Sequence, residues 1–237
     1  YTNSCGCLTM SLFPIFAPAT AAAATISFTA NGELTGTGSA RTFSSMALGT
    51  AADNRYIIVA IGTTGGGGGT DNCNSVTVGG TGLSKLVSKN HTDHQIAQIW
   101  AGLITSGTSA DIVVTWARTA GRTGIGVWAA YGIGTMEDSG SASISSSSSA
   151  MSTSLDITAG GVAVGYTFIA SGGEGPGIVS FSWSNLTEDF DADIDATGEH
   201  SGASAAFATA QSGLTVSATP DVSVPLGTTV FAAWPPA

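Results

Sequence analysis

Short apolar runs with a period of two residues fill this chain from about residue 25 onward, and no segment there keeps a helical period over a dozen residues. In Val162–Phe168 and Val179–Trp183, larger apolar residues alternate with Ala, Gly, Ser or Thr. Such alternation places one kind of side chain on each face of a β-strand. Gly, Ser, Asn and Asp separate the runs, as they do in turns. The pattern predicts an all-β fold of antiparallel sheets, each buried on one face.

Similar segments recur in the same order about 103 to 107 residues apart, which indicates an internal duplication. The clearest pair is Val127-Trp-Ala-Ala-Tyr131 and Val230-Phe-Ala-Ala-Trp234. We therefore predict an antiparallel β-sandwich protein with two similar jelly-roll or immunoglobulin-like halves, residues 26–136 and 139–237. The alternative is one larger jelly roll whose two Greek keys look alike.

Two low-complexity segments interrupt this pattern. Gly65–Gly69 is predicted to be a loop tip between two strands. Ten of the sixteen residues from Ser139 to Ser154 are serine, a composition typical of a linker. The repeat also assigns the first strand of the second half to this region. We predict a short linker followed by a serine-rich edge strand.

The first 25 residues are uncharged and mostly apolar. The longest apolar stretch, Leu12–Ala24, contains two prolines and is shorter than the ~20 residues that span a bilayer. No Lys or Arg precedes it, so the charged start of a secretory signal is missing. We predict an N-terminal arm, residues 1–25, that becomes ordered on a neighbouring molecule; a floppy tail is the alternative. An arm of this kind predicts a homo-oligomer, most simply a trimer, and no membrane span.

Charge is scarce and unevenly distributed, with 9% charged residues and a net charge of −10. All six basic residues lie within the first 122 positions, and the rest of the chain carries eleven carboxylates without any Lys or Arg. Six scattered cations cannot follow a phosphate backbone, so nucleic acid is excluded as a partner. The asymmetry is typical of a contact surface opposite a solvated acidic pole, although the carboxylates could also simply keep the protein soluble.

The three cysteines, Cys5, Cys7 and Cys73, do not form a disulfide framework, because their number is odd and two of them flank one glycine. We expect a chain that folds in a reducing cytoplasm with passenger thiols. Neither the Cys-x-Cys pair nor the His91-Thr-Asp-His94 segment has further ligands at zinc-site spacing. We therefore predict that His91–His94 is an exposed loop without a metal.

The segment Glu188–Asp195 contains the highest density of carboxylates. On a strand, its four aspartates would share one face and the apolar residues between them the other. As a loop, Asp189, Asp191 and Asp193 could wrap Ca²⁺, but an EF-hand loop needs a Gly and a Glu where this chain has Ile and His. Two carboxylates on one strand also do not flank a cleft as those of a glycosidase do. We predict a solvated acidic strand that binds no metal and no cofactor.

Sequence signatures of catalysis are missing. The chain has no Gly-x-Ser-x-Gly elbow, no Walker loop and no His-Glu-x-x-His, and Gly124-Ile-Gly126 lacks the third glycine of a dinucleotide fingerprint. We predict no catalytic residue and no enzyme activity. The tryptophans fall within strand patterns, which predicts that they pack between sheets rather than form a sugar platform. They are Trp100, Trp116, Trp128, Trp183 and Trp234.

The order of the strand-like segments over about residues 40–235 forms a recognisable series. Its members are a Val-Gly-Gly strand ending near Gly80, Ile99-Trp100-Ala101, Thr105–Thr115, Gly126–Gly132, Ala159–Val164 and Trp183–Glu188. This series resembles β-sandwich proteins encoded among the virion genes of tailed bacteriophages and their gene-transfer relatives. The likeness rests on the order and residue patterns of the strand-like segments and includes no catalytic motif.

The resemblance implies a non-enzymatic structural protein of the virion surface, most simply a capsid decoration protein or head spike, assembled in the host cytoplasm. Its implied partners are identical subunits and other virion proteins such as the major capsid protein. The apolar arm, residues 1–25, is not part of the family's pattern; its composition separately predicts attachment through the N-terminal side. The class has no agreed active site, so no catalytic residue is carried over. The alternative is a tail-fibre type module that binds a host receptor or surface glycan. A secreted hydrolase is a third hypothesis.

Overall fold

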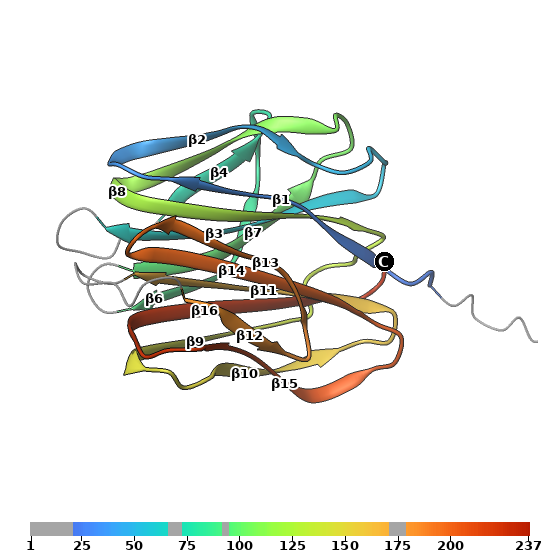
Figure 1. The fold of residues 1–237 in the computed structure, drawn as a ribbon. Helices are drawn as coiled ribbons and strands as arrows, with labels where there is room; N and C mark the ends of the chain where they lie inside the picture. The colour runs from blue at the N-terminus through green and yellow to red at the C-terminus, as the bar shows by residue number, and fades with distance from the viewer. Residues whose placement is uncertain (1–20, 66–72, 92–94, 171–178) are drawn as a thin grey trace, which may run out of the picture.

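The computed structural model describes residues 21–65, 73–91, 95–170 and 179–237, and these form sixteen strands without a helix (Figure 1). All strand pairs within them are antiparallel. The prediction of an all-β protein with antiparallel sheets is therefore confirmed.

The first half of the chain supplies eight strands. They are β1 (Thr25–Leu34), β2 (Gly38–Ala47), β3 (Arg55–Gly65), β4 (Cys73–Val78), β5 (Thr81–Gly82), β6 (Ser84–His91), β7 (Gln95–Leu103) and β8 (Ser109–Tyr131). β8 changes partners along its length: residues 109–116 pair with β2 and β4, and residues 123–131 pair with β1 and β3. It thereby joins an outer layer, β2-β8-β4-β5, to an inner layer, β6-β7-β3-β8-β1.

The second half repeats this plan with two separate sheets. Its strands are β9 (Asp138–Ser147), β10 (Met151–Ile157), β11 (Gly161–Ala170), β12 (Phe181–Ser184), β13 (Thr187–Asp195), β14 (Gly198–Phe207), β15 (Gln211–Pro220) and β16 (Val224–Trp234). The inner sheet has the order β13-β14-β11-β16-β9, and the outer sheet has the order β10-β15-β12.

The strand pairings of the two halves correspond. β15 and β16 together take the place of β8, and the pairs β3·β7, β3·β8 and β6·β7 recur as β11·β14, β11·β16 and β13·β14. Val127 pairs with Val59 on β3, and Val230 pairs with Tyr166 on β11, so the two matched segments hold equivalent places. This correspondence favours a duplication over one large jelly roll, while the division between residues 136 and 139 stays a prediction.

The two inner sheets pack face to face, which gives four layers from β2 and β4 at one side to β10 and β15 at the other (Figure 1). Ile58 and Trp128 of the first half share this central core with Val164, Tyr166 and Phe168 of the second. Separate cores fill the space between the inner and outer layers of each half. The expectation of one-sided burial is therefore wrong for the inner sheets, because each half covers the other's remaining face.

The serine-rich region is a strand rather than a linker. β9 begins at Asp138 and pairs with β16 at the edge of the inner sheet. Ala142 and Ile144 alternate with its serines and pack against the core of the second half. The predicted serine-rich edge strand is therefore confirmed, and only the linker expected before it is wrong. The alternating apolar positions, and not the serine content, indicated the local structure.

Both described chain ends lie at one pole of the molecule, here called the terminal pole (Figure 1). The amide of Ala24 donates to Gly160 O at 2.8 Å, and the amide of Ala237 donates to Gly132 O at 2.8 Å. Ala24 is buried and Thr25 begins β1, so the last residues of the predicted arm belong to the folded body. Residues 1–20 of that arm, with Cys5 and Cys7, lie outside the described residues, as do 66–69 of the glycine loop.

Candidate functional site

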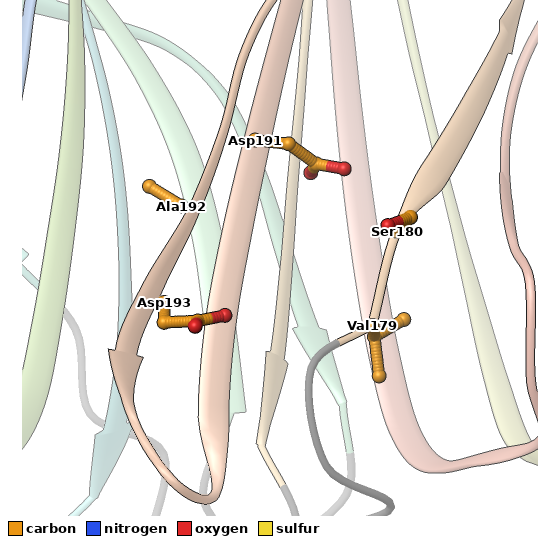
Figure 2. Close-up of a pocket in the computed structure, with 5 residues that line it drawn as sticks. All are labelled: Val179, Ser180, Asp191, Ala192 and Asp193. Atoms are coloured by element: carbon orange, nitrogen blue, oxygen red, sulfur yellow. The ribbon is translucent and has the colours of Figure 1, made fainter.

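Four carboxylates gather around the start of β12 at the pole opposite the chain ends. Asp191 and Asp193 come from β13, Glu199 from β14 and Asp221 from the turn after β15. We call these four residues the carboxylate cluster. Two of them line a small hollow of about 180 Å³ together with Val179, Ser180 and Ala192. Figure 2 shows the side chains of Asp191 and Asp193 directed toward the segment that contains Val179 and Ser180, and that of Ala192 directed away.

Three members of the cluster bind three successive backbone amides. Val179 N–H donates to Glu199 Oε2 at 2.6 Å, Ser180 N–H to Asp221 Oδ1 at 3.1 Å and Phe181 N–H to Asp191 Oδ2 at 2.9 Å. The side chains of Val179 and Phe181 are buried in the core at this end of the second half. The cluster therefore fixes the backbone of a segment whose side chains close a hydrophobic core.

Burial and like charge disfavour ionisation of Glu199 and Asp191. Glu199 is 4% exposed and pairs across the strands with Asp193. Burial, together with the charges of Asp193, Asp191 and Asp221, raises the pKa of Glu199 to about 8 despite the hydrogen bond from Val179. Burial also raises the pKa of Asp191 to about 6, with further contributions from Glu188 and Asp193. Of these two carboxyl groups, Glu199 therefore takes up a proton more readily.

The four aspartates of β13 do not share one face. β-Bulges occur between Glu188 and Phe190 and between Asp193 and Asp195, and each bulge reverses the side-chain alternation. Asp189 consequently accepts a hydrogen bond from Trp128 Nε1 at 2.7 Å, and Asp195 forms an ion pair with Arg122, both in the first half. The expected row of four aspartates is wrong because the bulges direct two of them toward the other half.

The predicted absence of a metal concerns the candidates Asp189, Asp191 and Asp193. The first bulge separates Asp189 from the other two, and Asp191 Oδ2 already accepts a backbone N–H. Within the part of the chain that the structure describes, no three His, Cys, Asp or Glu side chains are grouped to hold a metal ion. The geometry thus offers no cage of free carboxylate oxygens of the kind that Ca²⁺ takes.

Chelator should accordingly leave thermal stability unchanged. In excess EDTA we expect the melting temperature to move by less than about 2 °C, which is under 1 kcal/mol for a chain of this size. Differential scanning calorimetry measures this directly. A fall of more than about 5 °C, reproduced by Asp191→Asn with Asp193→Asn, would instead reveal a bound cation.

A second polar cluster connects the two halves. Nε2–H of His200 donates to Glu33 Oε1 at 2.9 Å, while Tyr166 Oη donates to Gly124 O at 2.9 Å and lies 3.2 Å from His200 Nδ1. Burial lowers the pKa of His200, and hydrogen bonds from His200 and Asn31 outweigh burial and lower the pKa of Glu33. Tyr166 and His200 are fully buried, so no substrate reaches this chain of groups. These hydrogen bonds fix the contact between the two halves.

Other candidate residues also have internal partners. Cys73 is a free, buried thiol whose pKa burial raises to about 12, as expected of a passenger cysteine. His91 ends β6, and its Nε2 lies 2.8 Å from Ser145 Oγ; the rest of His91–His94 is outside the described residues. Four tryptophans are buried and the fifth, Trp183, packs against two cores of the second half, so the prediction that they pack between sheets is confirmed.

The sequence reasoning located half of the carboxylate cluster. It singled out Asp191 and Asp193 by the density of carboxylates, but it did not find Glu199, Asp221 or the amides of Val179–Phe181. A signal for Glu199 existed, since it is the one Asp, Glu, Lys or Arg of the strand Gly198–Phe207.

The described residues include no helix of the length and hydropathy that a membrane crossing requires. Neither protein-family models, nor curated proteins, nor solved structures match this chain, so its function has to be argued from its own residues.

Proposed function

We propose that this protein is a non-enzymatic structural protein of a particle surface, of the decoration or spike kind found on tailed-phage virions. One observation carries the proposal: ionisable groups in both polar clusters bind the protein's own backbone or each other. Glu199, Asp191 and Asp221 bind consecutive amides, and His200 joins the two halves. Groups engaged in this way stabilise a fold and are not free to act on a substrate.

The outer layers suit close packing beside identical copies. Exposed hydroxyl residues cover most of the outer sheet of the second half, beside the exposed Asp156, and Thr42 and Ser44 do so on β2 of the first half. The residues of that second outer sheet are Ser152, Ser154, Ser182, Ser184 and Thr215. Neutral surfaces can be brought together without removing charges from water, which is costly. A homo-oligomer that packs on other virion proteins follows from this proposal.

The terminal pole is the proposed anchor. The uncharged N-terminal segment joins the body there at Ala21, and an apolar groove of about 210 Å³ lies beside it, lined by Ala23, Ala24, Gly160 and Ala206–Ala208. Apolar surface of this kind contributes about 25 cal/mol per Å² when a neighbour covers it. The acidic carboxylate cluster lies at the opposite pole, which would then face solvent.

Particles should therefore carry the chain on their surface and lose it when the segment is removed. We expect antibodies against the folded protein to label intact particles by immunogold electron microscopy. A variant without residues 1–20 retains β1 and should keep the same circular dichroism spectrum. Its incorporation should fall at least about tenfold, which corresponds to only ~1.4 kcal/mol of lost contact. Unlabelled particles, or normal incorporation of the truncated chain, would contradict the proposal.

A further inference from the structure

Among the described residues, no cation acts on Glu199 or Asp191 of the carboxylate cluster. No Lys or Arg occurs after Arg122, and Arg122 itself pairs with Asp195 toward the other half. We propose that the cluster is a pH-dependent clasp on the segment Val179–Phe181. When its carboxylates take up protons, they hold this segment against the rest of the second half. When they lose those protons, the segment loosens. The inference does not depend on the role at a particle surface.

The arrangement of the carboxylates explains why their negative charge has to be reduced by protonation and not by a neighbouring side chain. Three different elements, β13, β14 and the turn after β15, each direct a carboxylate at the same three-residue segment. Every charged group that acts on Glu199 within the described residues is another carboxylate, namely Asp191, Asp193 and Asp221. Glu188 of β13 adds to the charge at Asp191. With all of them ionised, Glu199 would be an unpaired charge in a buried position.

His200 faces the other side of the inner sheet, and burial lowers its pKa, which disfavours its charged form. His200 follows Glu199 on β14, so its ring lies on the opposite face, where it contacts Glu33 of the first half. The segment Val179–Phe181 contributes only backbone amides and one hydroxyl. Opening of this segment would bring Glu199 into water and relieve the repulsion, and it would also expose Val179 and Phe181 from their core.

The direction of the pH effect follows from linkage. Glu199 has a raised pKa of about 8 in the closed state, against an ordinary value of 4.5 when water surrounds it. The closed state therefore binds more protons than the open state between these values. The clasp is tightest below about pH 4.5, weakens as pH rises toward about 8 and changes little above it. Asp191, whose pKa is raised to about 6, acts in the same direction over a lower range.

Hydrogen exchange of the full chain tests the clasp. Protection factors of the Val179–Phe181 amides are measured by mass spectrometry at about pH 5 and pH 8, after correction for the intrinsic rates. We expect protection to fall about a hundredfold at the higher pH. Glu199→Gln imitates the protonated carboxyl and can still accept from Val179 N–H. It should show high protection at both pH values. Asp53→Asn removes one exposed charge elsewhere and should respond as the unmodified chain does.

Two results would overturn the clasp: equal protection of the unmodified chain at both pH values, or the same pH response in Glu199→Gln as in the unmodified chain. If Glu199→Gln does not fold, the titration of the Glu199 carboxyl in the unmodified chain decides by ¹³C NMR. A midpoint above pH 7 supports the clasp and a midpoint below about pH 5 refutes it. Asp193→Asn, which removes the facing charge, should lower that midpoint.

Discussion

Replacing Arg55 with Met should lower the free energy of unfolding by about 4 kcal/mol. Arg55 begins β3 and is 0% exposed, yet no carboxylate of the described residues pairs with its guanidinium. It donates instead to four backbone carbonyls, those of Leu48, Gly49, Ile104 and Ser106, at distances between 2.7 and 3.1 Å.

These carbonyls belong to the β2–β3 and β7–β8 connections at the terminal pole, so one side chain joins two loops to the start of an inner strand. The apolar Met side chain would fill part of the space but leave the acceptors unpaired, and each buried unpaired group costs about 1 to 3 kcal/mol. Chemical denaturation monitored by tryptophan fluorescence measures the loss.

Arg122→Met is the matched control for this experiment. Arg122 forms one ion pair with Asp195 and its side chain is 28% exposed, so the same substitution should cost less than about 1 kcal/mol. An equal loss of unfolding free energy in the two variants would show that Arg55 stabilises the protein no more than Arg122 does. Its hydrogen bonds to four carbonyls would then not form a structural network.

Gly62→Ala should destabilise the protein by about 3 kcal/mol, because β3 and β11 approach each other closely at this position. A Cβ at Gly62 would lie 2.6 Å from Phe168 Cβ and closer still to the ring. Phe168 is fully buried between the inner sheets, so its ring cannot move aside without separating them. Gly82→Ala, at a site with no atom within 4 Å of the new Cβ, should be close to neutral.

A double-mutant cycle tests whether this contact joins the two halves. Phe168→Ala removes the ring atoms that the new methyl group meets, so the double variant should lose at least about 1 kcal/mol less than the sum of the single variants. Additive losses would mean that Gly62→Ala acts within the first half alone. The midpoint of guanidinium denaturation for all four proteins decides between these outcomes.

Local periodicity accounts for the features of the fold that the sequence predicted. Val179, Phe181 and Trp183 alternate with exposed serines, and the structure directs all three toward the core, Phe181 and Trp183 from β12 and Val179 from the residues just before it. The matched segments Val127–Tyr131 and Val230–Trp234 occupy equivalent strands. The first property depends on residues within a few positions of each other, since side chains of a strand alternate between its faces whatever lies opposite. The second was visible because the two segments, 103 residues apart, have similar sequences.

The second face of each inner sheet could not be inferred in the same way. Alternation along Val162–Phe168 correctly separated large residues from small ones, but both sets are buried. Ala163 packs inside its own half, and Val164, Tyr166 and Phe168 pack against the first half. A small residue on a strand fits a closely packed face as well as an exposed one. Only the docking of the two halves therefore decided whether a given face is buried or exposed.

The carboxylate cluster could likewise be predicted only in part from the sequence. The density of acidic residues identified Asp191 and Asp193, because charge is visible in the sequence itself. Their contact with Glu199, Asp221 and the amides of Val179–Phe181 depends on the register of β13 with β14, on two bulges and on a turn some thirty residues further along. Such long-range pairings are chosen by packing of the whole molecule, and a one-residue change of register would turn each of these side chains to the other face.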